Sequence, residues 1–190
     1  MSKPNIFIIS GPSGAGEDSV IEGLKKYLKI ERVITASTRP MRAGESEDNP
    51  YRFISKKEFQ EKIKRGDMAE YAQEYNGNFY GVDKNELERV KNSGRIGIWK
   101  IEYKGVITAK KKYPEIKSIF IAPPSLEILE KRILQRDQDA SPEYLKERKK
   151  YTEEWLKHRD IYDYKVVNEE GELEETVKKV IEIIKSNLSA

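Results

Sequence analysis

The sequence predicts an α/β protein with a central parallel sheet covered by helices on both faces. Residues 5–10 form a short apolar, β-branched run that ends in a glycine-rich turn, and apolar residues follow at helical spacing from Val20 to Leu28. Further short apolar runs alternate with helical stretches, which is typical of repeated strand–helix units. Because 190 residues are enough for one full-sized domain, we expect a single domain over residues 1–190.

Three later runs extend the predicted sheet. Residues 96–101 and 118–121 are short and apolar, as expected of buried strands. The run 165–167 precedes a helical pattern over 172–188. Since each run lies next to a helical stretch in the chain, all three fit a parallel sheet flanked by helices.

Two stretches do not fit the strand–helix repeat. Residues 35–90 contain arginines, aromatics and short alternating runs at 51–54 and 71–75, which indicates a small mixed lobe. Residues 125–160 predict two charged helices, the second starting at Ser141-Pro142, and such a hairpin can swing as a lid. The predicted core then comprises about residues 1–34, 91–124 and 161–190.

Composition argues against several classes of protein. The longest apolar runs span only a few residues, far fewer than the ~20 that cross a bilayer, so we expect no membrane partner. The start of the chain does not resemble a signal peptide and the sequence has no cysteine, so we expect a cytoplasmic location. Lys and Arg total 36 and Asp and Glu 33, and this interleaved balance gives no sign of a nucleic-acid partner.

The turn after the first strand has the spacing of a phosphate-binding loop. In Gly11-Pro12-Ser13-Gly14-Ala15-Gly16, successive backbone N–H groups and the following helix N-terminus can enclose an anion. The full motif continues with a lysine and a hydroxyl residue. This chain instead has Glu17 and Asp18, with a hydroxyl only at Ser19. The loop frame is therefore present and its usual ammonium group is not.

Several separated motifs resemble the guanylate kinase family, in order and at matching intervals from the first strand to the last helix. Agreement of many motifs in register is far more specific than the loop alone. They are the loop itself, Ser37-Thr38-Arg39-Pro40-Met41-Arg42-Ala43-Gly44-Glu45, Tyr51-Arg52-Phe53, Gly66-Asp67-Met68-Ala69-Glu70, Tyr80-Gly81, Arg132, Arg136, Glu147-Arg148, Tyr162-Asp163-Tyr164 and Val166-Val167-Asn168.

This resemblance implies a P-loop NTPase core, a GMP-binding lobe at about residues 35–90 and a helical lid at about 125–160. It implies transfer of the ATP γ-phosphoryl group to GMP, giving GDP and ADP, with Mg²⁺ as cofactor. GMP and ATP would be small-molecule substrates of a monomer or a homodimer.

The matching positions give the chain a set of candidate site residues. For the GMP phosphate they are Arg39, Arg42, Tyr51 and Tyr80, with Glu45 in the same motif. For the guanine edge they are Thr35, Glu70 and Glu102. For catalysis at the nucleotide phosphates they are Arg39 and the lid arginines Arg132, Arg136 and Arg148. For ATP they are Gly11, Pro12, Ser13, Gly14, Ala15, Gly16, Glu17, Asp18 and Ser19.

The residue types suit this chemistry in their own right. Planar arginine forks bind phosphate oxygens bidentately, and tyrosine hydroxyls add neutral donors. Glu70 offers acceptors to the N1–H and N2–H₂ donors of guanine, a pattern that adenine lacks. Lid arginines neutralise charge on the transferred group while closure excludes water. Taken singly, these side chains could also be surface charges or packing aromatics, and Arg132 and Arg136 could pair with nearby acids along a helix.

An exchange of charges suggests how the missing loop lysine is replaced. Where the family usually places an acid, this chain has Lys100, followed by Glu102. We expect Lys100, at the end of a core strand beside the loop, to supply the ammonium group, and to pair with Glu17 when no nucleotide is bound. Asp18 and Ser19 would help to hold Mg²⁺, partly through water, and the acid at Glu102 suits either guanine or, through water, Mg²⁺.

Three functions remain open from the sequence. The lid arginines favour an ATP:GMP phosphotransferase with a displaced lysine. Glu17 and Asp18 favour an inactive guanylate kinase-like module that binds GMP or a phosphorylated partner. A kinase for another nucleotide or for a phosphorylated sugar is the third, and Glu70 argues against it.

Overall fold

The computed structural model describes residues 5–42, 44–74, 77–136 and 141–189. Within them, five strands form a parallel sheet in the order β2-β7-β1-β8-β9. The strands are β1 (Ile6–Ser10), β2 (Ile30–Arg32), β7 (Ile96–Lys100), β8 (Lys117–Ala122) and β9 (Tyr164–Val167). The four predicted runs are thus confirmed as neighbouring strands of one sheet, and the short β2 is an addition.

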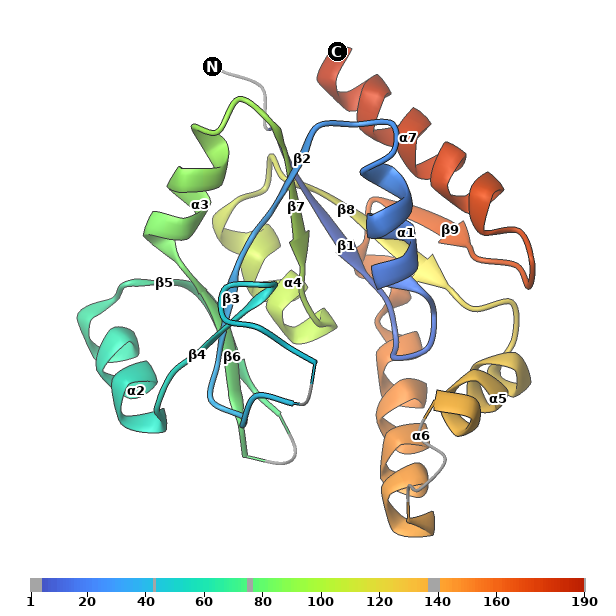
Figure 1. Cartoon of the computed structure of the whole chain (residues 1–190), viewed down its shortest axis with the longest axis horizontal. Helices are drawn as coiled ribbons and strands as arrows, with labels where there is room; N and C mark the ends of the chain where they lie inside the picture. Colours follow the sequence, from blue (N-terminus) through green and yellow to red (C-terminus); the bar gives the residue numbers. More distant parts are fainter. Residues whose placement is uncertain (1–4, 43, 75–76, 137–140, 190) are drawn as a thin grey trace.

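Helices cover both faces of this sheet (Figure 1). Because side chains alternate along a strand, Ile6 and Ile8 pack into one apolar layer, and Phe7 and Ile9 pack into the other. Helices α3, α4 and the end of α6 complete the first layer, and α1, α5 and α7 complete the second. Their bounds are α1 (Glu17–Leu24), α3 (Lys84–Lys91), α4 (Tyr103–Lys112), α5 (Leu126–Arg136), α6 (Pro142–Lys157) and α7 (Leu173–Ser189).

A second, mixed sheet lies beside the first and has the strand order β4-β3-β6-β5. Strands β3 and β4 are parallel, and the other pairs are antiparallel. Phe59 of the adjoining helix is fully buried against this sheet, next to Ala36 and Met68. The elements are β3 (Thr35–Ser37), β4 (Tyr51–Phe53), α2 (Lys56–Arg65), β5 (Met68–Gln73) and β6 (Phe79–Asp83).

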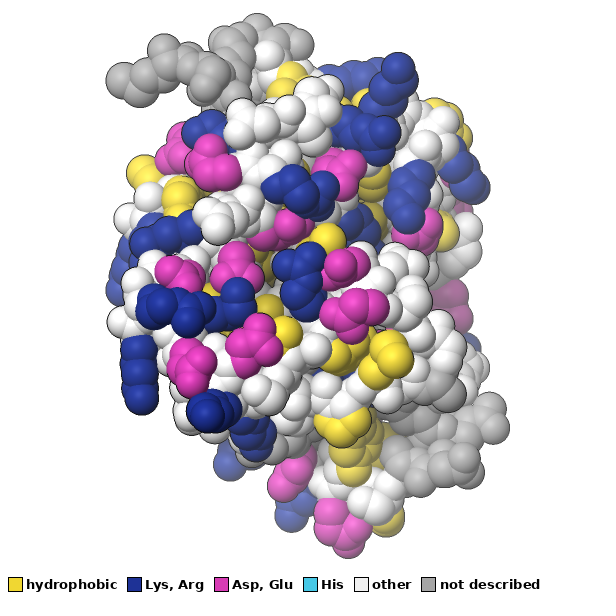
Figure 2. Space-filling model, turned by 60° about the vertical axis from the view of Figure 1, so that its left-hand side comes forward, with side chains coloured by type: hydrophobic (Ala, Val, Ile, Leu, Met, Phe, Trp, Pro, Cys, Tyr) yellow, Lys and Arg dark blue, Asp and Glu magenta, His cyan; other side chains and the backbone are white. Residues whose placement is uncertain are grey.

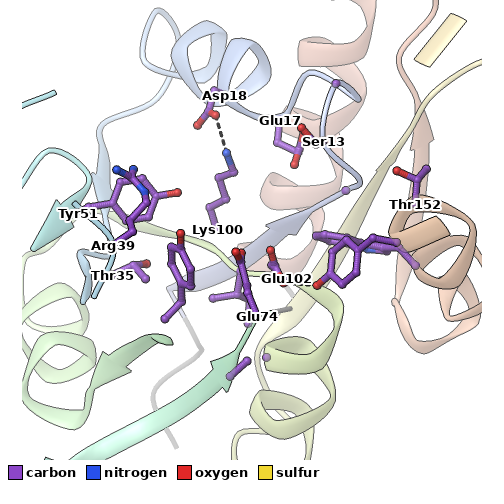
Figure 3. A pocket seen from close by; sticks show the side chains of 18 of the residues that line it. Ser13, Glu17, Asp18, Thr35, Arg39, Tyr51, Glu74, Lys100, Glu102 and Thr152 are labelled. Atoms are coloured by element: carbon purple, nitrogen blue, oxygen red, sulfur yellow. Dashed lines mark hydrogen bonds and ion pairs between the residues drawn. The ribbon is translucent and has the colours of Figure 1, made fainter. Parts of the chain in front are cut away.

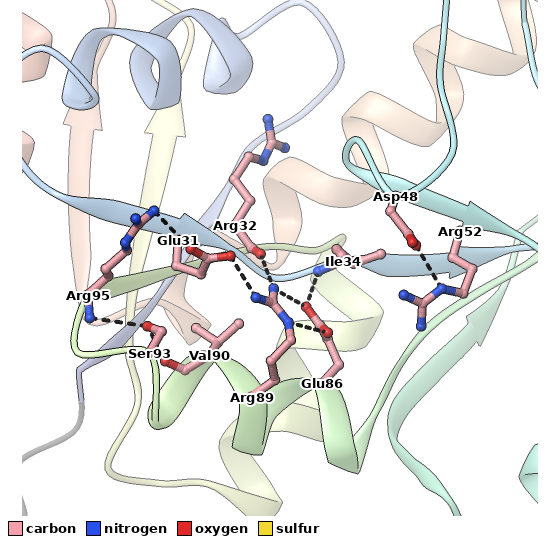
Figure 4. Close-up of polar contacts among 10 residues, drawn as sticks. All are labelled: Glu31, Arg32, Ile34, Asp48, Arg52, Glu86, Arg89, Val90, Ser93 and Arg95. Carbon is pink, nitrogen blue, oxygen red and sulfur yellow. Dashed lines mark hydrogen bonds and ion pairs between the residues drawn. The ribbon is translucent and has the colours of Figure 1, made fainter.

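The chain crosses from the first sheet to the second at Ile34, and α3 fixes this crossing (Figure 4). The buried Glu86 carboxylate accepts a hydrogen bond of 2.8 Å from the Ile34 amide and is paired with Arg89. Arg89 in turn donates to the carbonyl of Arg32 and to Glu31. The network therefore holds the end of β2 and the start of β3 in a fixed relation.

Helix α6 begins at the predicted position and ends in the core. The Ser141 hydroxyl accepts a hydrogen bond from the amide of Tyr144, and Pro142 occupies the first turn, as expected of a helix start. At the other end, Trp155 is buried against the first sheet and donates from Nε1 to the hydroxyl of Tyr162, 3.0 Å away. The short turn η1 (Arg159–Ile161) then leads to β9. This end of α6 is therefore part of the core.

Charges of both signs share the surface. On the face seen in Figure 2, lysine and arginine side chains lie among aspartate and glutamate side chains. Ion pairs on the surface of the described residues include Arg65 with Asp67 and Lys91 with Glu88. None of the helices in the described residues combines the length and apolar character of a membrane span.

Candidate functional site

A cavity of about 580 Å³ lies where the ends of the core strands face the second sheet and α6 (Figure 3). The loop after β1 lines one end, and residues of β3, β4, β5 and β6 line the other. Its volume is within the range of small-molecule sites. The carboxyl ends of strands in an open parallel sheet are also where ligands commonly bind.

The cavity brings together most of the predicted site residues. Those on its wall are Gly11, Ser13, Gly14, Gly16, Glu17, Asp18, Ser19, Thr35, Arg39, Arg42, Glu45, Tyr51, Glu70, Tyr80, Lys100 and Glu102. Pro12, Ala15 and Arg132 do not line this cavity. The side chains of Arg136 and Arg148 lie outside the described part of the structure.

The loop after β1 is held open by side chains behind it. Asn168 donates from Nδ2 to the carbonyl of Ala15 at 2.8 Å, and its Oδ1 accepts from the Thr176 hydroxyl. Gly16 has a φ of +99°, and a Cβ atom there would lie 2.4 Å from Nδ2 of Asn168. Only glycine satisfies both conditions. The loop then leads directly into α1, whose N-terminus faces the cavity.

Arg132 of α5 lies at the back of this loop. Its guanidinium group is 3.4 Å from the carbonyl oxygen of Gly14 and 3.3 Å from that of Asn168. A predicted lid arginine is thus next to the loop without lining the cavity.

The structure corrects the expected partner of Lys100. Its Nζ lies 2.5 Å from Oδ2 of Asp18, and the expected ion pair with Glu17 is not formed (Figure 3). Arg32 approaches the other oxygen of Asp18 at 3.3 Å. The register of the sheet explains why the Lys100 side chain can reach Asp18, because Lys100 is paired with Ile9, two residues before the loop begins. Burial opposes ionisation of Asp18, but Lys100 and Arg32 outweigh it and lower its pKa.

Glu17 points into the loop instead. Its side chain is buried, and burial raises its pKa to about 7. The charge of Lys100 and hydrogen bonds from the amides of Glu17 and Gly16 oppose this rise. As the first residue of α1, Glu17 faces inward, whereas Asp18 is turned toward the end of β7 and accepts the hydrogen bond from Lys100.

At the other end of the cavity, Arg39 forms a bidentate pair with Glu45. Nη1 and Nη2 donate to the two carboxylate oxygens at 2.6 and 2.5 Å, which lowers the pKa of Glu45 to about 2. The Arg42 amide also donates to Glu45, and the Arg39 guanidinium lies 4.9 Å from the ring centre of Tyr51. A planar fork that binds a carboxylate in this way has the geometry to bind a phosphate. Burial raises the pKa of the nearby Tyr80 hydroxyl to about 12, so it stays a neutral donor.

Three carboxyl groups lie together between the two ends. Glu70 is almost fully buried, and burial raises its pKa to about 8, with the charge of Glu102 adding to the rise. Burial and a hydrogen bond with Glu74 raise the pKa of Glu102 to about 8 as well. The hydroxyl of Tyr151 on α6 donates to Oε2 of Glu102. This wall therefore offers acceptors to a ligand rich in N–H donors. Thr35 lies on the same cavity wall, at the start of β3.

Comparison with known proteins decides the family. The family model for guanylate kinase matches residues 3–187. A guanylate kinase from Buchnera aphidicola is 40% identical over 173 residues, which cover 90% of this chain and 83% of the relative. One from Haemophilus influenzae is 38% identical over 189 residues, covering 98% and 89%. The chain belongs to the guanylate kinase family.

A solved structure of the family agrees with the fold. The crystal structure of guanylate kinase from Anaplasma phagocytophilum superposes with a TM-score of 0.78 at 28% identity, covering all of this chain and 88% of that one. The predicted fold class, an α/β core with a central parallel sheet flanked by helices, is therefore confirmed, as is the resemblance drawn from the motifs.

In this guanylate kinase family member, α6 supplies cavity residues that sequence reasoning did not single out. They are Tyr144, Tyr151, Thr152 and Trp155, and Glu74, directly after β5, also lines the cavity. The three aromatics are seven and four residues apart, which places them on one face of a helix. That stripe was visible in the sequence, but its direction depends on how α6 packs against the core.

Proposed function

We propose that this chain is an ATP:GMP phosphotransferase, which transfers the γ-phosphoryl group of ATP to GMP and gives ADP and GDP. The observation that carries this function is one cavity with a phosphate-binding loop at one end, an arginine–tyrosine anion site at the other and the carboxyl groups of Glu70, Glu74 and Glu102 between them. Family membership supports the same reaction. Phosphoryl transfer depends mainly on position and charge neutralisation, and this arrangement supplies both.

At the GMP end, the phosphate would replace Glu45 as the partner of Arg39. Arg42 and the hydroxyls of Tyr51 and Tyr80 line the same end and can complete the anion site. For the base, we assign Glu70 and Glu102 as acceptors for N1–H and N2–H₂, with Thr35 at the same edge. Adenine lacks these donors, so the carboxylates would select guanine.

At the ATP end, Lys100 would take the role of the missing loop lysine. The distance to Asp18 supports this role, because the ammonium group already lies at the start of α1 and on the cavity wall. A lysine head can reach the same phosphates from a different backbone position. Backbone N–H groups among residues 13–19 would hold the phosphates, with Arg132, Arg136 and Arg148 adding positive charge from the lid at about 125–160.

Mg²⁺ would be held mainly by phosphate oxygens and water. The described residues contain no group of three His, Cys, Asp or Glu side chains that could hold a metal alone. Asp18 and Ser19 line the cavity beside the loop, and one or two such oxygen ligands suit Mg²⁺, which usually keeps several waters. The bound ion would neutralise charge between the phosphates.

We also propose a cytoplasmic location. The protein would be a monomer or a homodimer, which light scattering distinguishes.

A coupled ADP-release assay with ATP, Mg²⁺ and GMP tests this function. We expect the native chain to turn over, and Lys100→Ala to lose about 100-fold or more in rate, the effect of removing one transition-state charge contact. Lys91→Ala is the matched control, because Lys91 is an exposed lysine of α3 outside the cavity. No turnover by the native chain, with GMP still bound, would favour the binding module instead. An unimpaired Lys100→Ala would remove Lys100 from the mechanism.

A further inference from the structure

Three parts of the molecule meet at the carboxyl group of Glu102. Glu102 itself follows β7 of the core sheet. Tyr151 reaches it from α6 and donates a hydrogen bond to Oε2. Glu74, directly after β5 of the second sheet, hydrogen-bonds the same carboxyl group. The orientation of the Glu102 carboxyl group therefore depends on α6 and on the second sheet.

The position of the Tyr151 hydroxyl is set by core packing. The ring of Tyr151 lies 6.0 Å from that of Tyr103 and 5.9 Å from that of Trp155. Trp155 donates to the Tyr162 hydroxyl, which lies 2.9 Å from Oγ of Ser10 at the end of β1. This buried chain ties the end of α6 to the strand that leads into the phosphate loop. A motion of the lid that leaves this end in place would leave Tyr151 in place too.

The two carboxyl groups that face the base are positioned differently. Glu70 packs directly over Gly105, so the backbone of α4 limits where its carboxylate can lie. Glu102 is only half-buried and depends on its hydrogen-bond partners for orientation. Recognition of two neighbouring N–H donors requires both acceptors in fixed positions, and a small displacement weakens it strongly.

We propose that Tyr151 is a positioning residue for base recognition, whose hydroxyl holds the Glu102 carboxylate in the orientation that accepts the N–H donors of guanine. This inference rests on the proposed function, and it adds a residue of α6 to the determinants of base specificity. Tyr151 acts through Glu102.

The test compares Tyr151→Phe with the native chain. The change keeps the ring packing and removes only the hydroxyl, so we expect the KM for GMP to rise about tenfold, the loss of one hydrogen bond to a charged group. The KM for ATP and kcat should change by less than about threefold, because the reacting phosphates lie elsewhere in the cavity. Calorimetric titration with GMP alone should show the same tenfold weakening. Tyr103→Phe is the matched control: it removes a hydroxyl from the same aromatic cluster but lies outside the cavity wall.

A double-mutant cycle with Glu102→Gln separates positioning from general loosening. Under the proposal, Tyr151→Phe weakens GMP binding far less when Glu102 is already altered, because the two residues act through one hydrogen bond. The proposal would be overturned if the two changes weakened GMP binding independently, so that their fold-changes multiply in the double variant. An unchanged GMP affinity in Tyr151→Phe would also overturn it.

The same measurements distinguish the inference from the function on which it rests. A native chain that binds GMP without turnover would refute the phosphotransferase, while the affinities of the variants still decide the role of Tyr151. A native chain that does not bind GMP would overturn both. Thermal melting of Tyr151→Phe and Tyr103→Phe within a few degrees of the native chain shows that the comparison concerns folded protein.

Discussion

Gly105 provides the space that the Glu70 carboxylate occupies. A Cβ atom at this position would lie 2.8 Å from Oε2 of Glu70, closer than non-bonded atoms normally approach. Because Gly105 lies inside α4, alanine there suits the helix and the protein should still fold. The carboxyl end of Glu70 must move instead. The position of one buried acceptor thus depends on a missing side chain in a neighbouring helix.

For Gly105→Ala we therefore expect the KM for GMP to rise about tenfold or more, because the displaced Glu70 carboxylate is no longer aligned with the N–H donor of guanine. The KM for ATP, measured in the same steady-state experiment, serves as the internal control and should stay within about twofold. An unchanged KM for GMP would show that Glu70 does not contact the base.

The carboxyl groups of Glu70 and Glu102 also predict how base binding depends on pH. Burial raises both pKa values to about 8. The groups that face Glu70 are Glu102 and Lys112, and those that face Glu102 are Glu74, Tyr151 and Lys104. At pH 6.5 the empty site therefore holds protons on these groups. Guanine donates N–H groups and needs ionised acceptors, so binding must expel protons.

We expect the dissociation constant of guanosine to fall about tenfold or more between pH 6.5 and pH 8, because binding releases at least one proton from these two carboxyl groups. Guanosine is the suitable probe because it lacks the phosphate, whose own ionisation would add to the effect with GMP. Calorimetry in two buffers of different ionisation enthalpy measures the released proton directly. Proton uptake, or an affinity independent of pH, would contradict the assignment.

At the scale of elements, the crossing between the sheets depends on α3. Replacing Glu86 by alanine would leave the half-buried Ile34 amide without its acceptor and would remove one of the two carboxylate partners of Arg89. We expect a loss of about 2–4 kcal/mol in the free energy of unfolding, as for other broken buried polar networks. Urea denaturation measures it. Glu88→Ala on the same helix, where the carboxylate is exposed and 3.8 Å from Lys91, should cost less than about 0.5 kcal/mol; equal losses would argue against the network.

The elements that could be predicted from the sequence are those with strong local signals. The apolar run and glycine turn at residues 5–16 predicted β1 and its loop, and proline after Ser141 predicted the start of α6. The three-residue strand β2 carries too short a pattern to detect. The strand order of the second sheet depends on pairings between residues far apart in the chain, such as Ala36 with Gly81, which local periodicity does not encode.

For the site, motifs predicted which residues meet but not how they pair. The cavity contains Arg39, Glu70 and Lys100 as expected. The pairing of Lys100 with Asp18 could not be foreseen, because neighbouring carboxylates at the start of a helix differ only in the direction of their side chains. Tyr151 was missed for a similar reason: only tertiary packing turns its face of α6 toward Glu102.

For the whole molecule, the pairing of β1 with β7 has a consequence for how such proteins are recognised. It places Ile9 beside Lys100, so the loop after β1 and the end of β7, which are far apart in the sequence, lie at the same edge of the sheet. An ammonium group can be delivered there from either stretch. A search pattern that insists on lysine directly after the last loop glycine would discard this protein, although a cation stands beside that loop in space.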